Sequence, residues 1–139
     1  MSTEAAVSTR ATGRFEIKKW DEKPYEELEG GKKLTRASVQ HSWHGDIEGE
    51  GTLEYLMAYR DDGSADYAGQ HRVVGSIGGR SGSFVLQDRG TFSGEAARGT
   101  LSVVPGLATG GLKGLHGEGS YVSKKGEHHS TLTLDYDFE

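Results

Sequence analysis

The chain has 139 residues with 22 glycines, no cysteine and 33% hydrophobic residues, and its formal net charge is −5. The length fits one domain with a real core, and the lack of cysteine excludes disulfide scaffolds, thiolate zinc sites and thiol nucleophiles. The negative charge, without a lysine and arginine stripe, argues against nucleic acid as a partner, and no apolar run approaches the ~20 residues that span a bilayer.

The N-terminal segment is expected to lie outside the fold. Residues 1–11 are small, polar and aperiodic, which is typical of a flexible tail. They also lack the charged and apolar regions of a signal peptide, so we expect a cytoplasmic protein with no membrane segment. A single domain is therefore predicted over residues 12–139.

The first predicted strand covers residues 13–20, where Phe15 and Ile17 share one face. Residues 21–33 follow it, with Pro24 at a position that suits the start of a helix and Gly30-Gly31 as a stop signal. This segment predicts a single helical turn or a long loop.

The rest of the chain alternates between apolar and polar residues in short runs. Asp61-Asp62-Gly63 is a hairpin signal because aspartate and glycine tolerate tight turns, and a second turn is expected at Gly78-Gly79-Arg80. A further turn is expected at residues 45–51. The strands predicted by alternation are residues 34–43, 52–60, 64–77, 81–94, 99–105 and 130–138.

Glycines recur between residues 104 and 121 without helical periodicity, which is typical of bends and close approaches in a sheet. About eight strands with short connections predict an all-β, eight-stranded antiparallel up-and-down barrel, since closure removes exposed sheet edges. A seven- or eight-stranded sandwich is the alternative, but glycines inside strands favour the curvature of a barrel. We expect the glycine-rich stretch to help close the barrel and to shape its mouth.

Three segments carry a family resemblance: EGTLEYLMAYRDDG, GGRSGSFVLQDRGTF and VPGLATGGLKGLHGEG with the STLTLDYDFE terminus. Together they resemble the DUF3224 family of small bacterial proteins, whose fold is similar to the allene oxide cyclase barrel. The resemblance covers nearly the whole chain from Thr12. It implies a barrel that commonly self-associates and has a cavity open at one end, but not that this chain cyclises an allene oxide. Glu16, the carboxylate of the first strand, receives no role because alternation places it away from Phe15 and Ile17.

The sharpest site hypothesis joins His71, Tyr55 and Asp88 as catalytic residues inside the barrel. A buried histidine near a carboxylate can act as an acid or a base, and a tyrosine hydroxyl can orient a carbonyl or a phenol. The alternative is that buried polar groups simply satisfy one another. If a bulge reversed the strand parity, Glu54 would point inward in place of Tyr55.

Other residues on the same predicted faces are expected to bind the substrate: His41, Trp43, Met57, Tyr59 and Phe84. The alternative for the aromatic residues is plain core packing. No metal site is predicted, because histidines three apart or adjacent in a strand point to opposite faces.

Two functions fit these residues. One is a cyclase or isomerase that needs no cofactor and acts on a small apolar metabolite held in a dry cavity. The other is a non-catalytic module that binds or carries a hydrophobic small molecule. A structural role would follow if the barrel were filled by its own side chains. Leu56, Ala58 and Val74 on the outer face lead us to expect a homodimer or a small homo-oligomer.

Overall fold

The computed structural model describes residues 9–124 and 129–138. It is built from β-strands, with one 3₁₀ turn, η1, at Glu29–Gly31. The strands are β1 (Thr9–Glu27), β2 (Lys33–Gly45), β3 (Ile47–Tyr59), β4 (Ala65–Ile77), β5 (Arg80–Phe92), β6 (Ala96–Val103), β7 (Thr109–Gly110), β8 (Leu115–Lys124) and β9 (His129–Phe138).

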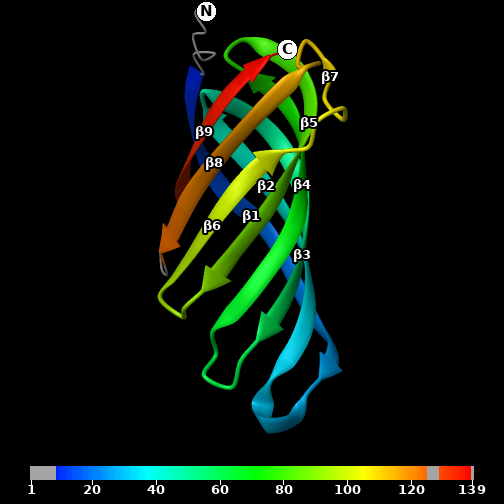
Figure 1. Ribbon diagram of the computed structural model, residues 1–139, viewed down its shortest axis with the longest axis vertical. Coiled ribbons are helices and arrows are strands. Elements are labelled where there is room, and N and C mark those ends of the chain that lie inside the picture. Colours follow the sequence, from blue (N-terminus) through cyan, green and yellow to red (C-terminus); the bar gives the residue numbers. More distant parts are fainter. Residues whose placement is uncertain (1–8, 125–128, 139) are drawn as a thin grey trace, which may run out of the picture.

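The strands form one closed antiparallel barrel (Figure 1). Within the described residues, eight of them pair in chain order, and the pairing of β1 with β9 completes the ring. The two-residue strand β7 pairs with β5 beyond the part of β5 that pairs with β6. The predicted eight-stranded up-and-down barrel is therefore confirmed, and the alternative sandwich is not formed.

The first strand is longer than its sequence pattern predicts. It begins at Thr9 and not at residue 13, and Ala11, expected in the tail, is buried in the core. It also continues to Glu27 through the predicted helical turn, so that Pro24 lies in a strand. Beyond residue 16 no described residue of β9 pairs with β1, so this part of β1 is an edge, where proline is tolerated. Within residues 21–33 the turn is confined to η1, where both glycines have positive φ.

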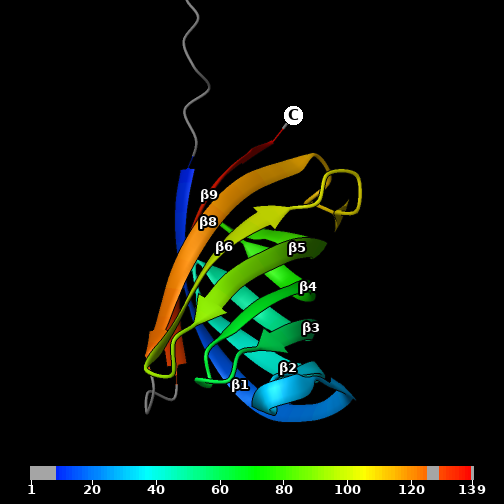
Figure 2. The same ribbon diagram turned by 60° about the horizontal axis from the view of Figure 1, so that its bottom comes forward.

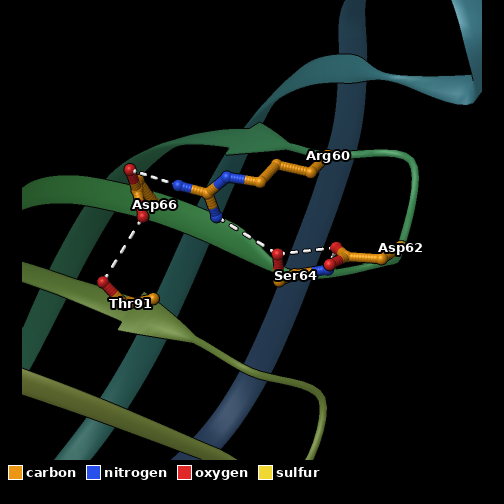
Figure 3. Close-up of polar contacts among 5 residues, drawn as sticks. All are labelled: Arg60, Asp62, Ser64, Asp66 and Thr91. Carbon is orange, nitrogen blue, oxygen red and sulfur yellow. Dashed lines mark hydrogen bonds and ion pairs between the residues drawn. The ribbon is translucent and has the colours of Figure 1, made fainter.

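The turn predicted at residues 45–51 is shorter than expected, because β3 already begins at Ile47. The hairpin signal at Asp61-Asp62-Gly63 is confirmed, since it connects β3 and β4 (Figure 3). Asp62 accepts hydrogen bonds from the Ser64 backbone N–H at 2.9 Å and hydroxyl at 2.7 Å. Arg60 donates to Asp66 at 2.7 Å, and Thr91 of β5 donates to the same carboxylate. These contacts are exposed, so they define the turn more than they stabilise the fold.

A row of glycines crosses the sheet where it bends. Gly49 of β3 lies opposite Gly75 of β4, which lies opposite Gly82 of β5, which in turn pairs with Gly110 of β7. A Cβ at Gly75 would clash with backbone atoms of β3. Side chains at these positions would hold neighbouring strands apart, so the glycines permit the tight curvature predicted from the sequence.

The barrel interior divides into two apolar clusters. The larger one contains Trp43, Phe84 and Leu112, and it fills the end of the barrel where β1 begins. Leu112 belongs to the connection between β6 and β8, and it is fully buried. Figures 1 and 2 show this connection at the end opposite the β1–β2 hairpin. Residues 104–114 of the glycine-rich stretch therefore cover the end of the barrel away from the cavity described below, so the expectation that they shape its mouth is wrong. Residues 115–121 belong to β8, whose pairing with β6 and β9 helps to close the ring, as expected. No α-helix among the described residues is long and apolar enough to cross a lipid bilayer.

Candidate active site

The other half of the barrel contains a cavity of about 360 Å³. Its lining includes Ile17 and Trp20 of β1, which face inward and are still 45% and 41% exposed. The mouth of the cavity therefore lies beside the edge segment of β1. The aromatic residues of the wall are Phe15, Trp20, Tyr55, Tyr59, Tyr67, Phe92 and Tyr121.

A β-bulge in β1 shapes this wall. Ile17 pairs with His41 of β2, but the next pair joins Lys19 to Gln40, so Lys18 is an extra residue. Such an insertion reverses the parity of the strand beyond it. As a result Trp20 and Glu22 line the cavity, although simple alternation from Ile17 would point both of them outward.

The floor of the cavity carries a buried carboxylate, Asp88 of β5, which is 1% exposed. Its Oδ2 accepts hydrogen bonds from the Tyr55 hydroxyl at 2.6 Å and from His71 Nε2 at 2.8 Å. Its Oδ1 accepts from the Tyr121 hydroxyl at 2.7 Å. Tyr121 lies in turn 2.6 Å from the hydroxyl of Tyr67. Contacts this short between a hydroxyl and a carboxylate are typical of charge-assisted hydrogen bonds.

The cluster continues away from the cavity through two histidines. His71 Nδ1 lies 3.3 Å from His41 Nε2, and both rings are almost completely buried. Because a carboxylate only accepts, His71 Nε2 carries the hydrogen of the Asp88 contact. His41 Nδ1 has no partner among the described residues. We call Asp88, His71, Tyr55, Tyr121 and Tyr67 the Asp88 cluster, and His41 extends it.

Burial and charge keep the protons of the cluster in place. Burial, together with the charge of Asp88, raises the pKa of Tyr55 well above its ordinary value. Burial and the neighbouring Tyr55 and Asp88 likewise raise the pKa of Tyr121. Burial raises the pKa of Tyr67 to about 12, and burial with the nearby His71 lowers the pKa of His41 to about 3. At neutral pH the three tyrosines therefore keep their protons and His41 is uncharged.

Glycines on the neighbouring strands make room for these rings. His41 lies opposite Gly51, Tyr55 opposite Gly69, Tyr67 opposite Gly90 and Tyr121 opposite Gly99. A Cβ at any of these glycines would come within 2.7 Å of the facing ring. Cross-strand pairing of a ring with a glycine lets the side chain lie flat against the barrel wall.

A second carboxylate, Glu22, lies in the cavity wall near the mouth. It accepts hydrogen bonds from Thr35 at 2.6 Å, from the Tyr59 hydroxyl at 2.7 Å and from the Trp20 ring at 3.0 Å. Burial acts to raise the pKa of Glu22, but these donors and the charge of Lys33 outweigh it and lower that pKa. Glu22 is therefore a fixed negative charge in the wall.

The sequence profile of DUF3224, described as "Protein of unknown function", matches residues 11–136. The chain belongs to the DUF3224 family. A crystal structure of a DUF3224 protein with unknown function from Shewanella oneidensis MR-1 superposes with a TM-score of 0.81. The two proteins are 33% identical, and the alignment covers 95% of this chain and 98% of the other. No functionally curated protein matches the chain.

The DUF3224 barrel brings together most of the residues singled out from the sequence. Tyr55, His71 and Asp88 are in direct contact, and Met57 and Tyr59 line the same cavity. His41 lies behind His71 and also packs against Phe15, but it does not itself line the cavity. The reserve candidate Glu54 lies on the outer face, where it pairs with Arg36.

Besides His41, two predicted substrate-binding residues do not line the cavity. Trp43 and Phe84 belong to the larger apolar cluster, which fills the other half of the DUF3224 barrel, and they do not line the cavity. Strand parity correctly predicted that they point inward, but parity carries no information about height along the barrel axis.

Three residues of the site were not predicted: Tyr67, Tyr121 and Glu22. Tyr67 shares the predicted inner face with His71, so alternation was a sufficient signal for it. Tyr121 follows Gly117 and Gly119 on the inner face of β8, and glycines at inward positions hide the alternation. Glu22 was hidden by the bulge at Lys18.

No group of three or more histidine, aspartate or glutamate side chains lies close enough to hold a metal ion in the part of the chain that the structure describes. The histidines of the DUF3224 site are instead engaged with one another and with Asp88.

Proposed function

We propose that this barrel binds one small, mostly apolar molecule in its cavity and exchanges a proton with it in an isomerisation or cyclisation that needs no cofactor. One observation supports the proposal above all others: a buried carboxylate, bonded to a histidine, lies at the floor of an aromatic cavity. The volume of about 360 Å³ falls in the range of small-molecule sites. Aromatic walls hold an apolar molecule, and the charged floor orients its polar end.

The chemistry follows from the cluster. Asp88 would take a proton from the bound molecule. The hydroxyls of Tyr55 and Tyr121, which donate to the carboxylate at rest, would then be free to turn toward the negative charge left on that molecule, while His71 holds Asp88 in place. The same proton would return to another atom of the molecule. Such an isomerisation consumes no co-reactant, so the atoms balance within one ligand. The low exposure of Asp88 and His71 keeps water away from the reacting end.

A non-catalytic carrier is the second candidate, and one observation favours it. All the hydroxyl and ring N–H groups that contact Asp88 are satisfied by it without any ligand. A cluster whose donors all have hydrogen-bond partners before a ligand binds also suits a site that holds its ligand without reacting with it.

Native mass spectrometry of the purified protein tests binding. Ala97 of β6 lines the cavity, so Ala97→Trp should fill the space and exclude a retained molecule. The matched control is Thr100→Trp on the exposed face of the same strand. We expect an added mass on the wild type and on Thr100→Trp but not on Ala97→Trp; the same mass on all three would contradict a cavity site.

Incubation of the protein with the retained compound separates the two candidates. An enzyme converts the compound to an isomer of the same mass, detected by a change in retention time, and Asp88→Asn slows this at least tenfold. A carrier returns the compound unchanged, which would refute the catalytic proposal.

A further inference from the structure

The direction of the hydrogen bonds decides whether the cavity floor offers donors or acceptors to a ligand. The single hydroxyl hydrogens of Tyr55 and Tyr121 both point to Asp88. Because the hydrogen of Tyr121 is used in this way, Tyr67 must donate in the 2.6 Å contact between the two hydroxyls. His71 contacts Asp88 with one ring nitrogen and His41 with the other. The Asp88 cluster therefore has no hydrogen left to offer to a ligand.

What remains on the floor is a set of lone pairs. The oxygens of Tyr55 and Tyr67 keep acceptor capacity, and a carboxylate has about four acceptor positions, of which Asp88 uses three. The high pKa of Tyr55 and Tyr121 keeps these protons on the tyrosines. Ser130, the other buried hydroxyl of the wall, can both donate and accept a hydrogen bond, so it does not favour a donor over an acceptor on the ligand.

From this arrangement we infer that the molecule bound here enters with a hydrogen-bond donor, namely a hydroxyl, phenol or enol, at its buried end. The inference rests on the proposed function, because it concerns the ligand of the same cavity. A carbonyl or carboxylate at that end would place its lone pairs against those of Tyr55, Tyr67 and Asp88. A site that loses hydrogen bonds in this way discriminates strongly against the mismatched ligand.

The cavity floor offers only acceptors because the negatively charged Asp88 draws the hydrogens of the cluster to itself. Replacing this carboxylate by an amide should therefore give the floor a donor. In Asp88→Asn one side-chain oxygen becomes an NH₂ group, which donates where the carboxylate accepted. If that group faces Tyr121, the Tyr121 hydrogen turns to Tyr67 and the Tyr67 hydrogen turns to the cavity. If it faces Tyr55, the Tyr55 hydrogen is released instead. In either orientation the floor gains a donor, so Asp88→Asn should accept a carbonyl.

The test uses two probes of similar shape, 2-naphthol as the donor and 2-acetylnaphthalene as the acceptor, titrated calorimetrically into the wild-type protein. We expect 2-naphthol to bind at least tenfold more tightly, and Ala97→Trp to abolish the binding of both. In Asp88→Asn the preference should fall by about tenfold or reverse. In Tyr67→Phe it should persist, because Tyr121 then presents its own lone pair and Asp88 still holds the tyrosine hydrogens.

The outcomes separate this inference from the proposed function. Equal affinity for the two probes in the wild type, or tighter binding of the ketone, would overturn the inference while leaving the cavity a binding site. Binding of neither probe would defeat the proposed function and the inference with it. The wild-type comparison alone decides the matter if Asp88→Asn does not fold.

Discussion

Removing single tyrosine hydroxyls from the Asp88 cluster should destabilise the protein in a defined order. Tyr67→Phe loses one neutral hydrogen bond, to Tyr121, which costs about 1 kcal/mol. Tyr55→Phe loses a bond to a buried carboxylate, which costs about 1.5–3 kcal/mol. Tyr121→Phe loses a bond of that kind and also leaves the Tyr67 hydroxyl without an acceptor, so it should cost about 2.5–4 kcal/mol.

Thermal unfolding followed by circular dichroism measures these differences, since 1 kcal/mol shifts the midpoint by about 3 °C in a domain of this length. The control is Tyr25→Phe, at a tyrosine that is 57% exposed, and it should leave the midpoint unchanged. The double variant Tyr67→Phe/Tyr121→Phe should be no less stable than Tyr121→Phe alone, because it removes the stranded hydroxyl. Equal losses for Tyr67→Phe and Tyr121→Phe would refute the assigned hydrogen-bond directions.

Three further predictions concern pH, packing and assembly. Because the folded protein lowers the pKa of His41 to about 3, its neutral form stabilises the fold above pH 6.5, and this stability is lost as the pH falls. Between pH 6.5 and 5.5, before unfolded glutamates take up protons to any large extent, denaturant unfolding should show a loss of stability whose slope approaches about 1.4 kcal/mol per pH unit. His41→Gln should flatten this slope and the exposed His44→Gln should not; an unchanged slope in His41→Gln would count against the account. Gly69→Ala places a Cβ against the backbone carbonyl oxygen of Glu54 and 2.6 Å from the Tyr55 ring, so it should cost about 1–3 kcal/mol by chemical denaturation; a loss under 0.5 kcal/mol would argue against this close approach. Leu56 is 57% exposed on the outer face, so light scattering should detect an oligomer that Leu56→Asp dissociates, and a wild-type monomer at all concentrations would remove the homo-oligomer proposal.

Most of the fold could be predicted from the sequence, because the alternation of apolar and polar residues along a strand depends only on neighbouring residues. Each inward position from Val39 to Trp43 and from Leu53 to Met57 was predicted from its neighbours, and all of these side chains are buried. The closed topology followed from short connections between strands. The ends of β1 were not predictable in this way, because Ala11 is held by pairing with Leu134, far away in the sequence.

The site was only partly predictable for the same reason. His71, Tyr55 and Asp88 each lie on an alternating strand, so their shared interior could be inferred. Tyr121 follows glycines that conceal its face, and Glu22 follows a bulge whose position depends on the pairing with β2. Trp43 and Phe84 are separated from the cavity by their height along the barrel axis. This height depends on the stagger between strands, which neighbouring residues in the sequence do not determine.

A crystal structure of the protein with 2-naphthol bound tests the central claim most directly, namely that the cavity above Asp88 is a ligand site with an acceptor floor. We predict the naphthalene ring among the aromatic walls, with its hydroxyl oxygen within about 3.2 Å of Tyr55, Tyr67 or Asp88. A ring bound only outside the barrel, or a hydroxyl directed at the mouth with the ring against Asp88, would contradict the claim.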